Sequence, residues 1–178
     1  MDAITTKDKL LLHARRLFWA NGYSNVSLRQ ITSEAGVDVA LISRHFGGKL
    51  GLFEATLEGA FTLFDTPPIT PTELVDAIVH IFAEAPRTSM EPSAVTMLLT
   101  NSHDRHVGDL VRRLYDTHFQ NGIRDLLGPD RSALFAAAVF GFSIAEKSLR
   151  VKGIADPASS AYRAQLRNFL MTAINHAQ

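Results

Sequence analysis

Two short segments carry residue types that serve catalysis or metal binding in other proteins. Gly141-Phe-Ser-Ile-Ala145 has the spacing of a nucleophile elbow, which needs a strand before the serine and a helix after it. The segment lies inside a helical pattern, so we interpret its small residues as positions of close helix packing. His103 and His106 stand one helical turn apart, but a metal site needs further ligands, and we expect a solvated helix start here. We therefore expect neither an enzyme nor a cofactor.

The most informative pattern spans residues 15–53, where two short helix patterns are joined by a tight glycine turn and flanked by longer helix patterns. Ser27 followed by Gln30 predicts a capping box, and Asp38 can cap the next helix. The apolar residues spaced to close a small core are Ile31, Ala35, Val37, Ile42 and Phe46. The helix of about residues 38–46 would then project into solvent, as a helix that enters the major groove of DNA must.

The whole chain predicts an all-α fold, because alternating strand patterns are nearly absent. Besides the helix-turn-helix, the predicted helices span about residues 5–21, 49–64, 72–85, 91–102, 104–127, 130–151 and 157–176. Net charge is zero, with +3 over residues 1–50 and −3 over the remainder, so the small basic excess lies where DNA would bind.

The sequence also indicates where the protein resides. It contains no cysteine, which excludes disulfides and cysteine-bound zinc and fits a reducing compartment. No charged and apolar leader opens the chain, so no signal peptide is expected. The most apolar run, Ala133–Ala145, is shorter than the roughly 20 residues that a membrane helix needs. We expect a cytoplasmic protein with no membrane partner, in which this run is a buried helix.

The N-terminal pattern resembles the TetR family of bacterial transcriptional regulators. The resemblance rests on Ala14-Arg-Arg-Leu-Phe18, Gly22-Tyr23, Ser27-Leu-Arg-Gln-Ile31, Ala35-Gly-Val37, His45-Phe46 and Lys49 to Phe53. It implies a nine-helix subunit with a helix-turn-helix DNA-binding domain at 1–47 and a helical ligand-binding and dimerisation domain at 48–178. It also implies a homodimer built on the last two helices and a small-molecule effector pocket in the second domain.

The resemblance also implies roles for individual residues. Ser27 and Lys49 would contact phosphates at helix N-termini, and Arg29 would reach a base edge or a phosphate. The residues that would face the groove are Val39, Ala40, Leu41, Ser43, Arg44 and His45. Arg44 is the best candidate for reading guanine. Two positions depart from the family pattern, since Ser43 replaces a frequent aromatic residue and Asp38 a frequent Ser or Thr. Both departures bear on the operator sequence.

For the effector pocket, the candidates are apolar side chains with a few polar groups. They are Phe61, Phe64, Met97, Tyr115, His118, Phe119 and Phe140. For each apolar residue the simpler interpretation is plain core packing. His118 falls on the apolar face of its predicted helix, where a histidine more often belongs to the core than to a ligand site.

These patterns together predict a dimeric, ligand-responsive regulator, most simply a repressor, that binds double-stranded operator DNA and releases it when effector binds. The apolar run Ala133–Ala145 is expected at the dimer interface, because a monomer would not tolerate it on its surface. We expect the complementary face to be formed by Tyr162, Leu166, Phe169 and Leu170. Two alternatives are an adaptor with a degenerate helix-turn-helix, favoured only by the acidic Asp38, and an all-helical enzyme.

Overall fold

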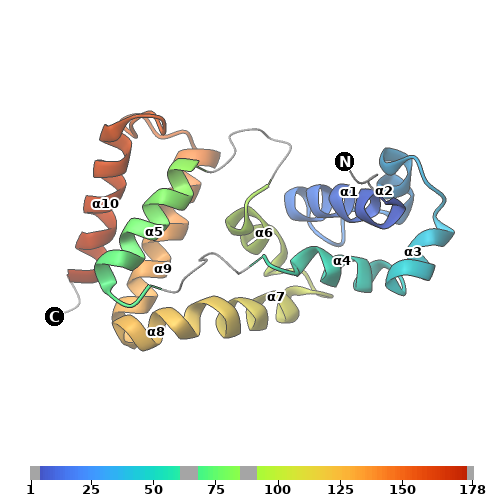
Figure 1. Cartoon of the computed structure of the whole chain (residues 1–178), viewed down its shortest axis with the longest axis horizontal. Helices are drawn as coiled ribbons and strands as arrows, with labels where there is room; N and C mark the ends of the chain where they lie inside the picture. Colours follow the sequence, from blue (N-terminus) through green and yellow to red (C-terminus); the bar gives the residue numbers. More distant parts are fainter. Residues whose placement is uncertain (1–4, 61–67, 85–91, 176–178) are drawn as a thin grey trace. The chain divides into compact units, whose positions relative to one another are not determined.

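The computed structural model describes residues 5–60, 68–84 and 92–175, and all regular structure in them is helical (Figure 1). The predicted all-α fold is thus confirmed. The α-helices are α1 Thr6–Asn21, α2 Leu28–Ala35, α3 Ala40–Phe46, α4 Lys49–Leu57, α5 Pro71–Glu84, α6 Ala94–Asn101, α7 Gly108–Tyr115, α8 Asn121–Leu127, α9 Pro129–Ser143 and α10 Ser160–Asn175. A π-helical segment, Asp116–Gln120, joins α7 to α8 without a break, and a second, Ile144–Ser148, extends α9. With α7 and α8 counted as one, the described residues form nine helices.

The chain divides into two compact units. Unit 1 comprises Met1–Phe61 and Arg87–Leu114. In it α1 packs against α2, α4 and α6, and α3 packs against α4. The largest of its completely buried side chains are Leu10, Phe18, Ile31, Ile42, Leu52, Phe53 and Met97. Helices α6 and α7 therefore complete the core of the unit that holds the helix-turn-helix.

Unit 2 comprises Thr62–Pro86 and Tyr115–Gln178. Helix α10 packs against both α5 and α9, and the three lie side by side in Figure 1. The side chains buried most completely in this unit are Leu74, Val75, Phe135, Tyr162, Leu166 and Leu170. Three residues predicted for the dimer face, Tyr162, Leu166 and Leu170, thus belong to the core of their own chain. That prediction was wrong because the apolar stripe of α10 is used against α5 and α9.

Several predicted boundaries differ from those observed. Helix α4 ends at Leu57, where the prediction continued to Phe64, and the part beyond residue 60 lies outside the described residues. The predicted helix 157–176 begins only at Ser160. Packing does not divide the chain at residue 47, so the predicted functional division into 1–47 and 48–178 stays a prediction. No helix in the described parts of the chain has the length and hydropathy to cross a membrane.

Candidate nucleic-acid interface

Helices α2 and α3 form a helix-turn-helix within unit 1. The side chain of Ser27 accepts a hydrogen bond from the Gln30 N–H at 3.1 Å and begins α2. Gly36 ends α2 in the left-handed conformation, at φ +67°, which glycine adopts without steric cost. The N-cap of α3 is Val39, and Asp38, one residue earlier, accepts the Ala40 N–H at 2.7 Å, so the acidic residue binds an unpaired N–H group of α3 as predicted.

The predicted core beneath the two helices is only partly closed by the five residues proposed for it. Ile31 and Ile42 are completely buried, whereas Ala35, Val37 and Phe46 are partly buried. Helix α1 contributes the remaining packing, since Leu10, Ala14 and Phe18 have no exposed surface. The core therefore holds α3 through one face only, and the other face is left to solvent.

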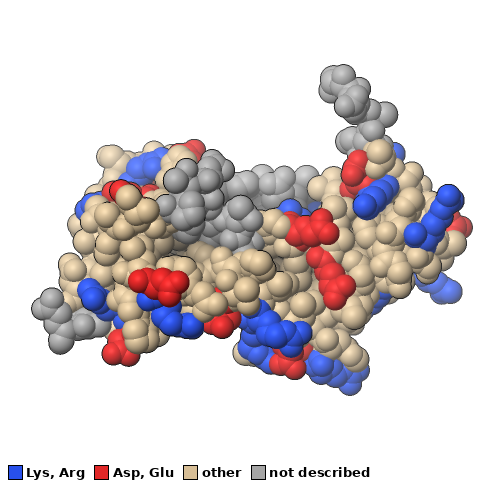
Figure 2. Space-filling view, turned by 60° about the horizontal axis from the view of Figure 1, so that its bottom comes forward, with Lys and Arg blue, Asp and Glu red and all other residues tan. Residues whose placement is uncertain are grey.

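The outward face of α3 carries most of the residues predicted to enter the groove. Val39, at the N-cap of α3, is 43% exposed, and Leu41 is partly buried. The other predicted groove residues are exposed, namely Ala40, Ser43, Arg44 and His45. Figure 2 shows Lys and Arg side chains over the helix-turn-helix, at the right of the view, with a few Asp and Glu among them. Such a face offers both hydrogen-bond donors and apolar atoms to base edges.

The junction between α3 and α4 is unusually tight. Gly47 ends α3 in the left-handed conformation, and α4 begins at Lys49. A Cβ atom added to Gly51 would lie 1.9 Å from the Phe46 carbonyl oxygen, which is far inside van der Waals contact. Only glycine at position 51 allows the first turn of α4 to lie against the end of α3. The geometry of α3 relative to α4 therefore depends on this residue.

The three residues predicted to meet the DNA backbone have different surroundings. Arg29 is exposed on α2. The Ser27 oxygen accepts the capping hydrogen bond, and its hydroxyl proton can still donate to a phosphate. Lys49 is partly buried, with its ammonium 4.4 Å from the centroid of the Tyr23 ring and 6.0 Å from that of Phe18. Partial burial lowers the pKa of Lys49, and the Asp104 carboxylate acts in the opposite direction.

The two segments whose residue types serve catalysis or metal binding in other proteins do not form such sites in the described parts of the chain. Ser143 is 4% exposed and ends α9 within a helical run, so the segment Gly141–Ala145 is not a nucleophile elbow. His103 and His106 are exposed, and His106 accepts a hydrogen bond from Arg105 at 3.0 Å. The described residues contain no group of three His, Cys, Asp or Glu side chains that could hold a metal ion.

The predicted effector residues are distributed over both units. Tyr115, Phe119 and Phe140 form an aromatic group in unit 2, with the Tyr115 ring centroid 5.5 Å from that of Phe119 and 5.7 Å from that of Phe140. Met97 is completely buried in unit 1. Phe61 and Phe64 lie outside the described residues.

His118 is exposed, and its predicted place on an apolar helix face was wrong. The reason is the π-helical segment Asp116–Gln120, in which an additional residue per turn rotates the side chains away from the regular α-helical register. The same segment brings the Tyr115 hydroxyl to Gln120 Oε1, to which it donates at 2.8 Å. Burial raises the pKa of Tyr115 to about 12, with a smaller contribution from Asp116.

Comparison with known proteins agrees with the geometry of the N-terminal helices. Residues 10–56 match the family described as bacterial regulatory proteins, tetR family. Over these residues the chain resembles the tetR family. Over 51 residues the chain is 47% identical to a probable HTH-type transcriptional regulator, YttP, of Bacillus subtilis. The matched segment covers 29% of this chain and about a quarter, 25%, of that relative.

Solved structures extend the likeness of the fold to the whole chain. NalD of Pseudomonas aeruginosa, a secondary repressor of the MexAB-OprM multidrug efflux pump, aligns with a TM-score of 0.70 and 18% identity over 99% of this chain and 100% of that one. A tetR-family regulator of Streptomyces coelicolor aligns with a TM-score of 0.56 and 18% identity over 100% of this chain and 85% of that one. At such identities the likeness shows a shared fold alone.

Sequence reasoning missed two polar residues of unit 1. Asn101 ends α6 and is completely buried, and Asp104 lies in the turn that follows. Both accept backbone N–H groups from residues 23 and 24, about 80 positions earlier in the chain. The one local signal was an Asn and an Asp close to a predicted helix end, which is too common to single them out.

Proposed function

We propose that the protein is a transcriptional regulator that binds a pseudo-palindromic operator through α3. The observation that carries the proposal is the outward face of α3, where Ser43, Arg44 and His45 are exposed while Ile42 anchors the helix in the core. Asp38 was the one feature that favoured a degenerate helix-turn-helix. Its carboxylate has a structural role, because it accepts the first N–H of α3, which removes the motive for the adaptor hypothesis.

We further propose a homodimer formed through α9 and α10. Leu134, Ala137 and Gly141 recur on one face of α9 and are exposed, and Phe169 on α10 is 46% exposed. The rings of Phe142 and Phe169 lie 6.1 Å apart, so the apolar surfaces of the two helices meet. A two-fold contact of two such helix pairs buries this surface in a four-helix arrangement. The dimer would present two copies of α3 to successive major grooves.

The effector site is proposed in unit 2 around Tyr115, Phe119 and Phe140. Their rings offer an apolar surface with one phenolic oxygen as an acceptor, because the Tyr115 proton is donated to Gln120, and this suits a small and largely apolar molecule. Such an effector can release DNA only by binding one dimer shape more tightly than the other. NalD is a repressor, and repression with release by effector is the mode that we propose here.

Selection of binding sites from a random duplex pool tests the proposal directly. We expect the full-length protein to enrich a two-fold symmetric sequence with half-site centres roughly 34–36 Å apart. An electrophoretic mobility shift with the DNA upstream of its own gene, in excess competitor DNA, should then show a specific complex. A protein at micromolar concentration that enriches no sequence and shifts no fragment beyond competitor binding would exclude the proposed function.

A further inference from the structure

A buried amide joins the end of α6 to the turn that follows α1, both within unit 1. The Tyr23 N–H donates to Asn101 Oδ1 at 2.8 Å. The Asn101 side-chain amide donates in turn to the carbonyl oxygens of Phe18 and Met97, each at 3.1 Å. Because Asn101 has no exposed surface, each of these bonds replaces one that water would otherwise supply. Loss of this side chain would leave the Tyr23 N–H without its partner.

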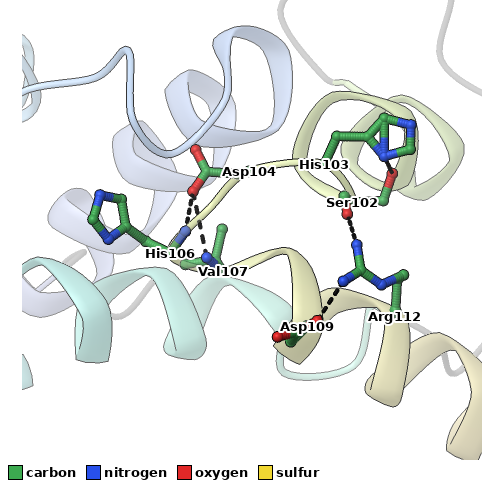
Figure 3. A network of polar contacts seen from close by, with 7 residues as sticks. All are labelled: Ser102, His103, Asp104, His106, Val107, Asp109 and Arg112. Carbon is green, nitrogen blue, oxygen red and sulfur yellow. Dashed lines mark hydrogen bonds and ion pairs between the residues drawn. The ribbon is translucent and has the colours of Figure 1, made fainter.

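A carboxylate three residues later binds the same turn. Asp104 lies between α6 and α7, and its Oδ1 accepts the N–H groups of His106 at 2.9 Å and Val107 at 3.3 Å (Figure 3). Its Oδ2 accepts the Ser24 N–H at 3.1 Å. Burial alone would raise the pKa of Asp104, but hydrogen bonds from Ser24, His106 and Val107 outweigh it and lower the pKa. The ionised carboxylate thus connects two turns that are far apart in the sequence.

Tyr23 connects this network to the start of α4. Its ring lies 4.4 Å from the Lys49 ammonium and 5.3 Å from the Phe53 ring, both on α4. Burial raises the pKa of Tyr23, and the charges of Asp104 and Glu54 add to the effect. The contact with the Tyr23 ring and the negative charge of Asp104 both favour the ammonium of Lys49 at this position.

We infer that Asn101 and Asp104 are positioning residues for DNA binding, which hold the turn of residues 22–25 and, through Tyr23, the ammonium of Lys49. Both residues lie outside the segment 10–56 that resembles other regulators. The turn that they hold precedes Ser27, the N-cap of α2, so it determines where α2 begins. A turn that is ordered before DNA binds adds no ordering cost to binding. Loss of that order would therefore weaken the affinity for every DNA sequence. This inference rests on the proposed function.

Three variants of the full-length protein separate the hydrogen bonds from the charge. Asn101→Leu removes the amide at similar volume, Asp104→Ala removes the carboxylate, and Asp104→Asn keeps an accepting oxygen without the charge. Val107→Ala is the matched control, because Val107 is completely buried in the same turn and its side chain makes no hydrogen bond to the network. All four should be compared well below their melting temperatures.

Amide hydrogen exchange and DNA binding are the two readouts. We expect the Tyr23 amide in Asn101→Leu and the Ser24 amide in Asp104→Ala to exchange about tenfold faster, as loss of one hydrogen bond implies. DNA selected by the wild type should bind about tenfold more weakly to both variants. Asp104→Asn keeps one of the two accepting oxygens and replaces the other with a donor, so it should restore only part of the affinity. NMR titration of the Lys49 side chain should show a lower pKa once the Asp104 charge is gone.

The outcomes separate this inference from the proposed function. A wild type that binds no DNA overturns both. If Asn101→Leu and Asp104→Ala both bind DNA with the affinity of the wild type, only the positioning role is wrong. Equal weakening by Val107→Ala would reduce the effect to general stability and would also overturn it.

Discussion

Each of the two units of this chain is stabilised internally by a different kind of contact. In unit 1, buried polar side chains join segments that are far apart in the sequence. Trp19 Nε1 donates to Thr56 Oγ1 at 3.2 Å, and Asn101 accepts the Tyr23 N–H at 2.8 Å. Both pairs are directional, so they set the orientation of α1, α4 and α6 as well as their separation. Recognition of base edges needs a scaffold of this kind.

Unit 2 relies on apolar and aromatic packing. The ring of Phe142 lies 5.9 Å from that of Phe82 and 5.8 Å from that of Tyr162, and the charged pairs lie at the rim. Arg163 pairs with Glu84 at 2.6 Å, where both side chains are about half exposed. Non-directional packing can adjust to small changes of shape more easily than a buried hydrogen-bond network. Geometry is therefore set most tightly in the unit proposed to read DNA.

The largest effect that we expect from one substitution concerns the assembly of unit 2. Gly141 has no atom within 4 Å of the position of an added Cβ, so Gly141→Arg should leave the fold of the chain intact. In the proposed dimer the charge would be buried without a partner, at a cost of about 3–5 kcal/mol. Sedimentation should show a wild-type dimer and a monomeric variant that binds operator only weakly.

Gly122→Arg is the matched control for this substitution. Gly122 on α8 is exposed and has equally open surroundings, but it lies outside the proposed interface. The control should remain dimeric. A wild type that sediments as a monomer at micromolar concentration, or a Gly141→Arg variant that remains a dimer, would contradict the proposed interface.

Gly51 in unit 1, unlike Gly141, has no room for a side chain, so its substitution should destabilise the fold itself. Gly51→Ala places a Cβ atom 1.9 Å from the Phe46 carbonyl oxygen, so α3 and α4 must move apart. We expect a loss of about 2–3 kcal/mol in the free energy of unfolding, together with weaker operator binding. Urea denaturation measures the first effect and fluorescence anisotropy the second. Gly122→Ala, with no atom in the way, should instead be neutral or stabilising by about 0.5–1 kcal/mol.

Local signals were enough to predict the helix-turn-helix. Gly36 ends α2, Asp38 accepts the first N–H of α3, and Ile31 and Ile42 fill the core, all within a window of about 15 residues. The helical fold followed from periodicity for the same reason. Such features depend on backbone preferences and on the spacing of side chains that are close together in the sequence.

Features that depend on distant pairing could not be predicted in this way. Nothing near Asn101 indicates that its partner is the Tyr23 N–H, 78 residues away. The π-helical segment that exposes His118 has no recognised sequence signal, and a regular helical register placed this residue wrongly. The apolar stripe of α10 was recognised, but periodicity does not say whether a stripe faces its own chain or a second copy. Leu166 shows the consequence, since it is completely buried within unit 2.

A smaller effect is expected at the exposed face of α3. Arg44→Ala should weaken operator binding by about 1–3 kcal/mol and relax specificity at one base position, because the guanidinium can bind both acceptors of guanine. Arg44→Lys is the control that keeps the charge but loses the planar fork, so it should retain non-specific affinity and lose discrimination. Binding-site selection with each variant measures both. Recovery of the wild-type consensus at wild-type affinity with Arg44→Ala would remove Arg44 from the interface.

The smallest effect should come from the partly buried hydrogen bond between Tyr115 and Gln120, at the π-helical segment Asp116–Gln120. Tyr115→Phe removes the hydrogen bond to Gln120 and should lower the free energy of unfolding by about 1 kcal/mol at neutral pH. The Tyr115 ring and its packing against Phe119 and Phe140 would remain. Denaturant unfolding of both proteins at pH 7 gives the difference.

The pH dependence of that difference tests the cause. The pKa of Tyr115 is raised from 10.0 to about 12 in the folded state. Its contribution to stability is therefore complete below pH 10 and is lost as the pH rises through 12, because the unfolded chain gives up the proton first. The wild type should lose its advantage over Tyr115→Phe across this interval. If the two proteins differ by the same amount at pH 9 and pH 12, Tyr115 is less buried than the structure shows, and unit 2 is more open at this point than its aromatic packing implies.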